Sequence, residues 1–192
     1  AMLFRTVRGE DIPTLLKIYA QYIDTPVTFE YALPSAAEFS ERVAAVAAFY
    51  PWLVCEEGGE CVGYAYAHRM QERAAYAWNA ELSVYLGKEY CGRGIGKKLY
   101  SALIRLCAAQ GIKTVYGIVT VPNAHSERLH ESLGFRRVGV LHNSGFKGGA
   151  WHSVAYFEKN IAPYGRSPSA VRPFPEIAAQ AADILSFANG EE

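Results

Sequence analysis

The stretch Tyr90–Tyr100, YCGRGIGKKLY, places glycines at positions 92, 94 and 96 and then continues into an apolar pattern with helical spacing. Glycines at alternate positions cost backbone entropy, so a chain that keeps them needs the conformations that glycine adopts freely. A glycine-rich turn that enters a helix also presents unpaired N–H groups at the positive end of the helix dipole. The stretch therefore predicts a phosphate-binding loop, with a tight strand-to-helix turn as the simpler alternative.

Two common phosphate motifs do not fit this loop. A Walker loop requires glycine where Cys91 stands and Ser or Thr where Lys98 stands. The dinucleotide fingerprint GxGxxG requires glycine at position 97, which is Lys97. The loop therefore either binds the phosphate of another kind of ligand or forms only a tight strand-to-helix turn.

Glu81 is the residue best placed for proton transfer. It lies in Ala80–Leu86, a segment that alternates as a strand does, with Leu82, Val84 and Leu86 on one face. Glu81 is on the other face, shortly before the glycine loop, which makes it a candidate general base. A solvated strand carboxylate is the alternative.

Composition indicates a globular chain with a sizeable core, because 51% of the 192 residues are hydrophobic and 20% are charged. Nineteen basic residues balance nineteen acidic ones, which argues against nonspecific binding to nucleic acid or membrane surfaces. No apolar run approaches the roughly 20 residues of a membrane span, and the N-terminus shows no signal pattern. The four cysteines show no CxxC pairing and the histidines no HExxH spacing, so we expect free thiols, a cytoplasmic location and no metal.

Periodicity predicts a mixed α/β fold in which helices cover both faces of one sheet. The expected strands are 2–8, 52–56, 61–69, 80–86, 113–119, 135–141 and 151–159. The expected helices lie within 12–23, 36–50, 95–110 and around 129–133, the second after a capping-box serine at position 35. Residues 163–175 predict an extended tail, and 177–188 a short terminal helix.

Around the loop, the chain resembles the GNAT superfamily of N-acetyltransferases, whose signature is [Q/R]xxGx[G/A]. Residues Cys91–Gly96 match all but its first position, where Cys91 replaces Gln or Arg. Three further segments resemble the phosphinothricin acetyltransferase type: YAxxxxxRxAYxWxxE at 66–81, PNxxSxxLHExLGF at 122–135 and GFKxGxWH at 145–152. The resemblance covers residues 2–160 and leaves 161–192 as a C-terminal extension.

The resemblance implies a mostly antiparallel sheet of about seven strands, with a V-shaped splay between the fourth and fifth. It implies acetyl-coenzyme A as co-substrate, with its pyrophosphate held by loop amides and its pantetheine arm along the end of the fourth strand beside a bulge. The implied contacts are Val84, Tyr85, Leu86, Gly92, Arg93, Gly94, Ile95, Gly96, Lys97, Asn123 and Ser126. Asn123 follows a proline turn, so a helix cap is its alternative role.

The same resemblance implies the catalytic and acceptor residues. Glu81 matches the acid of the WxxE segment and is the expected base, while His130 is either the acid that protonates the thiolate or a packed helix histidine. Acceptor contacts are expected from Phe29, Arg73, Tyr76, Trp78 and His152, with Arg73 pairing with a substrate carboxylate. The type commonly has aspartate after WH, whereas this chain has Ser153.

The expected activity is acetyl transfer to the amino group of a small amino acid or analogue, of the phosphinothricin or methionine sulfoximine and sulfone class. Two alternatives remain: acetylation of a peptide or protein N-terminus, and a non-catalytic sensor that binds acetyl-coenzyme A. The resemblance also implies a homodimer.

Overall fold

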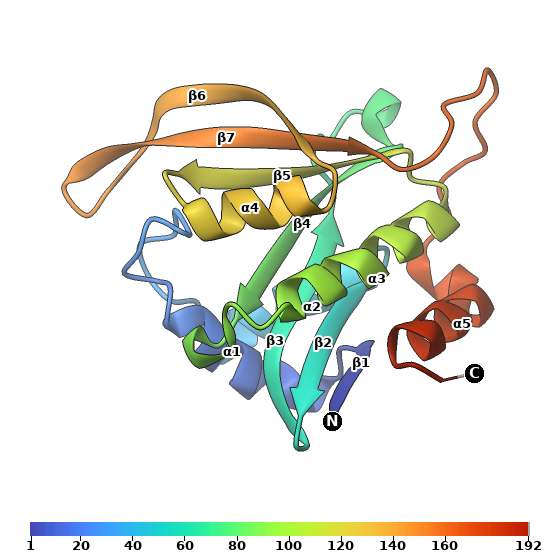
Figure 1. Ribbon diagram of the computed structural model, residues 1–192, viewed down its shortest axis with the longest axis horizontal. Helices are drawn as coiled ribbons and strands as arrows, with labels where there is room; N and C mark the ends of the chain where they lie inside the picture. Colours follow the sequence, from blue (N-terminus) through green and yellow to red (C-terminus); the bar gives the residue numbers. More distant parts are fainter. Residues whose placement is uncertain (192) are drawn as a thin grey trace.

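The computed structural model describes residues 1–191, and within them one seven-stranded sheet has the order β1-β2-β3-β4-β5-β7-β6 (Figure 1). The strands are β1 (Met2–Thr6), β2 (Trp52–Glu57), β3 (Glu60–His68), β4 (Asn79–Leu86), β5 (Thr114–Val121), β6 (Arg136–Lys147) and β7 (Ala150–Asn160). The α-helices are α1 (Ile12–Ala20), α2 (Ala36–Ala47), α3 (Ile95–Gln110), α4 (Ala124–Ser132) and α5 (Ala178–Ala188). The predicted mixed α/β fold is confirmed.

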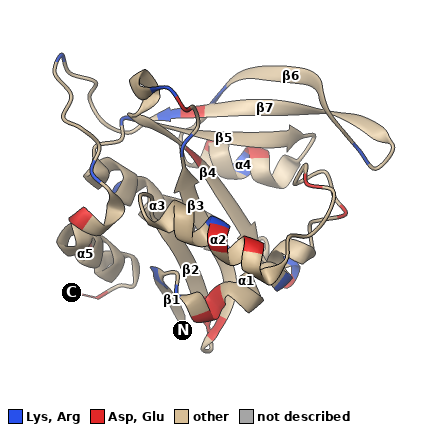
Figure 2. Cartoon of the chain, turned by 180° about the vertical axis from the view of Figure 1, so that it is seen from behind, with Lys and Arg blue, Asp and Glu red and all other residues tan. Residues whose placement is uncertain are grey.

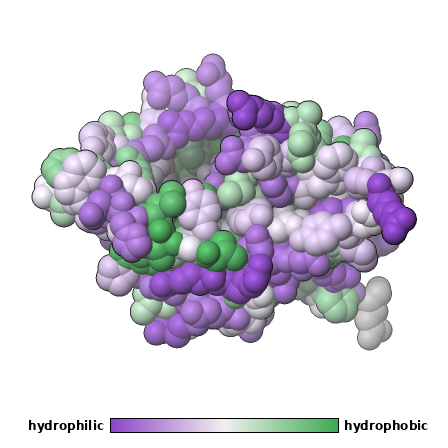
Figure 3. Space-filling view, turned by 90° about the horizontal axis from the view of Figure 1, so that it is seen from above, coloured by the Kyte–Doolittle hydropathy of each residue, from purple (hydrophilic) through white to green (hydrophobic). Residues whose placement is uncertain are grey.

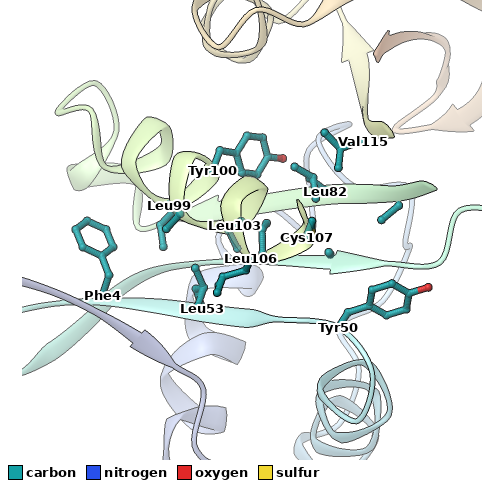
Figure 4. Packing of buried hydrophobic residues seen from close by; sticks show 14 of the residues in the cluster. Phe4, Tyr50, Leu53, Leu82, Leu99, Tyr100, Leu103, Leu106, Cys107 and Val115 are labelled. Atoms are coloured by element: carbon teal, nitrogen blue, oxygen red, sulfur yellow. The ribbon is translucent and has the colours of Figure 1, made fainter. Parts of the chain in front are cut away.

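Helix α3 covers one face of the sheet and forms the larger core. Its apolar stripe, Leu99, Leu103 and Leu106, packs on Leu53 of β2 and Leu82 of β4 (Figure 4). Helices α1 and α2 cover the opposite face, where a second core forms from Ile12, Leu15, Phe39, Val43, Trp52, Val54 and Tyr64. The alternation of β4 places its even-numbered apolar residues under α3, as predicted, and leaves Glu81, Ser83 and Tyr85 on the α1–α2 face.

The sheet opens between β4 and β5. These strands run parallel and pair only from Asn79 to Glu81 with Thr114 to Tyr116, after which they separate. The predicted splay is therefore present. The bulge expected in β4 is wrong, since β4 pairs with β3 in unbroken register from Glu81 to Leu86. Beyond Glu81, β4 and β5 diverge, so the backbone groups on the β5-facing edge of β4 have no partner strand. A bulge is therefore not needed to leave these groups unpaired.

Strand β6 is longer than the predicted 135–141. The polar segment HNSG at 142–145 interrupts the sequence pattern, but the structure accommodates it as a register shift between Leu141 and Gly145. Asn143 takes φ 50 there, and its N–H donates to Ser153 Oγ at 3.0 Å. Ser153 thus anchors the irregular part of the β6–β7 hairpin, at the position where the family type commonly has aspartate.

The chain after β7 crosses to the α3 face, where α5 packs against α3 (Figure 1). Ala181 of α5 is buried, and so is Ile177, directly before the helix. Asn189, at the end of α5, binds the free edge of β1: its Oδ1 accepts from Phe4 N at 2.8 Å and its Nδ2 donates to Phe4 O at 2.9 Å. The predicted terminal helix is confirmed, and its capping residue satisfies backbone groups of an edge strand.

Lysine and arginine are interspersed with aspartate and glutamate along the chain, as Figure 2 shows. Among the described residues, no helix combines the length and the apolar character required to cross a membrane.

Candidate active site

A groove of about 660 Å³ runs from the end of β4 past the glycine loop to α4. We call it the glycine-loop groove. Nine of the predicted cofactor contacts line it: Val84, Tyr85, Leu86, Gly92, Gly94, Gly96, Lys97, Asn123 and Ser126. Sequence reasoning missed other lining residues, among them Tyr22 of the α1–α2 connection and Arg128 of α4.

The glycine loop has a backbone that requires glycine. Gly92 and Gly94 have φ values of 79 and 80, in the left-handed region that other residues rarely adopt. Gly94 is also the N-cap of the sixteen-residue helix α3, and no side chain caps that end. The first N–H groups of a long helix therefore remain available to an anion in the groove.

Two of the predicted cofactor contacts, Arg93 and Ile95, do not line the groove. The side chain of Arg93 lies over the Tyr90 ring, 5.0 Å from its centroid, and its Nη1 is 3.4 Å from a Glu57 carboxylate oxygen. Ile95 is buried in the α3 core. Neither side chain lines the groove, so Lys97 is the predicted cation that faces it.

Asn123 acts as the N-cap of α4, since its side-chain oxygen accepts from Ser126 N at 3.2 Å. The helix-cap alternative is therefore confirmed. The residue also lines both the groove and a smaller cavity of about 80 Å³ in the β4–β5 splay. Ligand contact by Asn123 remains a prediction.

His130 is buried at the wall of the small splay cavity. Its Nδ1 is 2.7 Å from Ser126 O and, because a carbonyl only accepts, this nitrogen carries the proton. Tyr100, Phe135 and Phe157 surround the ring, and Gly117 makes room for it, since a Cβ there would lie 2.1 Å from Nε2.

Burial disfavours the charged imidazolium and lowers the pKa of His130 below its usual value. Within residues 1–191, its Nε2 has no hydrogen-bond partner. A neutral imidazole that carries its proton on Nδ1 has no proton on Nε2 to donate. These surroundings favour the packing role, while the acid role remains a prediction.

A second cavity, of about 420 Å³, lies on the α1–α2 face between β3, β4 and the β6–β7 hairpin, and we call it the Glu81 cavity. Glu81 and Ser83 line it from β4, and His68 and Tyr66 line it from β3. The Glu81 carboxylate lies 3.3 Å from His68 Nε2 and is about one-fifth exposed. A half-buried carboxylate beside an imidazole, in a cavity, is suited to accept a proton.

Residues 27–30 line one side of this cavity, and the segment 25–31 to which they belong is bound to the β6–β7 hairpin. Buried Lys147 donates from Nζ to Thr25 O at 2.8 Å and to Thr28 O at 2.6 Å, and Tyr31 donates its hydroxyl to Phe146 O. Phe29 lines this cavity, and acceptor contact by it remains a prediction. Its ring fills the space beside Gly145, where a Cβ would lie 2.3 Å from it.

The other predicted acceptor residues do not line the Glu81 cavity. Arg73 and Tyr76 are exposed in the β3–β4 connection, and Trp78 donates its indole N–H to Ser169 O of the C-terminal segment at 2.9 Å. His152 lies 2.9 Å from Lys147 O in the hairpin, with its ring 6.3 Å from that of Phe29. Acceptor contact by these residues remains a prediction.

His68 is the neighbour of Glu81 that sequence reasoning missed. Residues Tyr64, Tyr66 and His68 alternate along β3, and the register pairs His68 with Glu81 and Tyr66 with Ser83. Alternation in the sequence puts these three residues on one face, but the β3–β4 register is needed to place that face beside Glu81.

Comparisons with known proteins agree with this geometry. The family model described as an acetyltransferase (GNAT) domain matches residues 4–156. The chain is 34% identical over 177 residues to a phosphinothricin N-acetyltransferase of Streptomyces viridochromogenes, which covers 90% of this chain and 94% of that protein. It is 30% identical to an L-methionine sulfoximine/L-methionine sulfone acetyltransferase of Pseudomonas paraeruginosa, over 82% of this chain and 94% of that protein.

Among solved structures, a GNAT superfamily phosphinothricin acetyltransferase from Sinorhizobium meliloti in complex with acetyl-coenzyme A is similar, with a TM-score of 0.84. It is 31% identical, and the match covers 88% of this chain and 93% of that one.

Proposed function

The chain belongs to the GNAT family of acetyltransferases, and from this premise we propose that it acetylates the amino group of a small amino-acid-like acceptor with acetyl-coenzyme A. One observation carries the proposal. The glycine-loop groove and the Glu81 cavity meet at β4, where Val27 and Tyr85 line both. A donor held in the groove and an acceptor held in the cavity approach each other at the β4–β5 splay.

The groove fits acetyl-coenzyme A. Uncapped N–H groups at the start of α3 and the Lys97 side chain hold phosphate oxygens, and the unpaired edge of β4 beyond Glu81 offers backbone groups to an extended amide-bearing arm. Bound acetyl-coenzyme A supplies the thioester carbonyl that the amine attacks. The groove residues orient it toward the splay.

Glu81 takes the proton that the acceptor ammonium must lose before its nitrogen can attack. The reaction forms an N–C bond, breaks the C–S bond and returns one proton to the departing sulfur. His68 holds the Glu81 carboxylate in the cavity from the neighbouring strand. For the proton returned to sulfur we retain His130 as a candidate.

A small acceptor is supported by the wall that residues 27–30 form on one side of the Glu81 cavity, because the contacts of Lys147 and Tyr31 hold segment 25–31 against the β6–β7 hairpin. The relatives named above for phosphinothricin and for methionine sulfoximine and sulfone support the same acceptor class. Glu81 in the cavity speaks against a purely sensing role.

A thiol-release assay with acetyl-coenzyme A tests the proposal. The acceptor panel contains phosphinothricin, methionine sulfoximine, methionine sulfone, the common amino acids and short peptides. We expect turnover of the amino acid analogues. Turnover of peptides alone supports the peptide alternative, and binding of acetyl-coenzyme A without any turnover supports the sensor.

We also propose a homodimer and a cytoplasmic location. Val138, Leu141, Phe146 and Trp151 of the β6–β7 hairpin are between 46% and 64% exposed, and Figure 3 shows hydrophobic residues gathered beside a hollow on the face seen from above. Apolar clusters of this kind favour association. Light scattering tests the dimer, with Trp151→Glu expected to give monomers.

Four free thiols support a reducing compartment.

A further inference from the structure

A pocket of about 380 Å³ lies between α2 and strands β2–β4, beside the Glu81 cavity, and we call it the side pocket. Phe39, Arg42 and Ala45 line it from α2, and Trp52 and Tyr64 line it from the sheet. The residues that line both the side pocket and the Glu81 cavity are Tyr19, Glu30, Tyr66, His68 and Tyr85. The two spaces are therefore neighbours that share a wall.

Stacked aromatic rings form one side of the side pocket, beside the polar residues Glu30, Arg42 and His68. Trp52 stacks on Tyr66 with 4.0 Å between ring centroids and on Tyr64 with 5.6 Å, and Phe39 meets it edge-on at 6.3 Å. Trp52 is 3% exposed and Tyr64 is 1% exposed. Walls of stacked aromatic rings favour an apolar group over a charged one.

The side chains of β3 that lie beside Glu81 and its neighbours on β4 also line the side pocket. The register pairs His68 with Glu81, Tyr66 with Ser83 and Tyr64 with Tyr85, so all of them lie on the α1–α2 face. An acceptor bound at Glu81 therefore has the Glu81 cavity around it and the side pocket as its neighbour along β3, under α2.

Trp52 lines the side pocket with its ring and not with its indole N–H. The Nε1 atom is buried and has no hydrogen-bond partner in the part of the chain that the structure describes, so it is closed off from a ligand in the pocket. Arg42 at the pocket wall is already paired with Glu30, through Nη2 and Oε2 at 2.9 Å.

Building on the proposed acetyltransferase function, we propose that the side pocket binds the distal apolar part of the acceptor side chain. The preferred acceptor is then an amino acid whose side chain ends in an apolar chain longer than a methyl group. A site for short acceptors alone does not need an aromatic pocket of this size next to its base.

A matched pair of acceptors tests this inference: methionine sulfoximine and its homologue in which an S-butyl group replaces the S-methyl group. We expect kcat/KM to be about tenfold or more higher for the butyl homologue, because each added methylene leaves water for an apolar wall. Equal kcat/KM values for the two homologues overturn the inference and leave the proposed function intact. Transfer to neither homologue counts against the proposed acceptor class itself.

Ala45→Trp then locates the effect. Ala45 is an exposed residue of α2 that lines the side pocket, so an indole there occupies the space, and the butyl-to-methyl ratio of kcat/KM should fall to about one. Ala44→Trp, on the exposed surface of the same helix, should leave the ratio unchanged. The assignment to the side pocket is overturned if the butyl-to-methyl ratio of kcat/KM is unchanged in Ala45→Trp, or if it falls equally in Ala44→Trp.

Discussion

The Glu81 carboxylate lies 3.3 Å from Nε2 of His68, across the β3–β4 pair that joins these two residues in register. Both side chains line the Glu81 cavity and remain partly exposed, Glu81 by 21% and His68 by 30%. The two strands therefore hold a carboxylate and an imidazole together beside the space proposed for the acceptor amine.

Replacement of Glu81 tests the proposed base. Glu81→Gln keeps the shape of the side chain but removes its basicity, so kcat should fall by roughly 10²–10³-fold. Calorimetry should show acetyl-coenzyme A affinity within about twofold of the parent, because Glu81 does not line the groove. Glu60→Gln, at the exposed start of β3, is the matched control and should behave as the parent. An unchanged rate and pH–rate profile in Glu81→Gln would remove Glu81 from the mechanism.

His68 is expected to act by positioning Glu81. His68→Ala should lower kcat by about tenfold with little change in KM for acetyl-coenzyme A. His68→Gln places an amide nitrogen near the position of Nε2 and should recover most of the loss. Steady-state kinetics at saturating donor measure both variants. If the glutamine variant is as slow as the alanine variant, the position of the nitrogen is not what matters.

For His130 we predict a larger effect on stability than on chemistry. His130→Asn retains a donor toward Ser126 O but loses ring contacts, and should cost about 2–4 kcal/mol of unfolding free energy. We expect kcat to fall by less than about tenfold at a temperature where the variant is folded. A much larger fall in kcat, with acetyl-coenzyme A still bound, would support the acid role instead.

The same residue should contribute a pH dependence of stability. Because burial lowers the pKa of His130 in the folded state, the unfolded state binds its proton first, near pH 6.5. Its contribution is complete above that pH and is lost as the pH falls below it. Denaturant titrations from pH 7.5 to 5 should therefore show a steeper decline for the parent than for His130→Asn. Parallel declines would show that His130 is not the group responsible.

Cys91 stands where the family signature has Gln or Arg, and its side chain lines the groove beside the Tyr22 hydroxyl, with Sγ 3.7 Å from that oxygen. If backbone amides hold the phosphates, Cys91→Arg should bind acetyl-coenzyme A at least as tightly as the parent. Titration calorimetry measures this, with Cys91→Ser as the control of similar size. A weakening of tenfold or more in the arginine variant alone would mean that the loop holds its ligand differently.

Asn189 should stabilise the fold without affecting the reaction. Its side chain satisfies both backbone groups of Phe4 on the edge strand β1, so Asn189→Ala should cost about 1–2 kcal/mol. Urea unfolding measures the loss, and Asp183→Ala on the exposed side of α5 is the control. Equal stability of the two variants would show that water replaces the Asn189 contacts at no cost.

Much of the fold could be predicted from short-range patterns. Alternation in β4 identifies Glu81 as facing away from the core, and the glycines at 92 and 94 identify a left-handed turn before α3. Motifs of a few residues were enough to suggest the family that the comparisons show. Each of these features depends on neighbours close in sequence, so the local chain carries the signal.

The tertiary structure decided which of these residues meet. Only the β3–β4 register brings His68 to Glu81, and only packing under α4 surrounds His130 with aromatic rings and keeps it neutral. The placement of Arg73 outside the Glu81 cavity follows from the path of the β3–β4 connection, which no periodicity describes. These relationships join residues that are distant in sequence, or they depend on the burial that packing creates. A one-residue shift in strand register would change them, although the sequence pattern would stay the same.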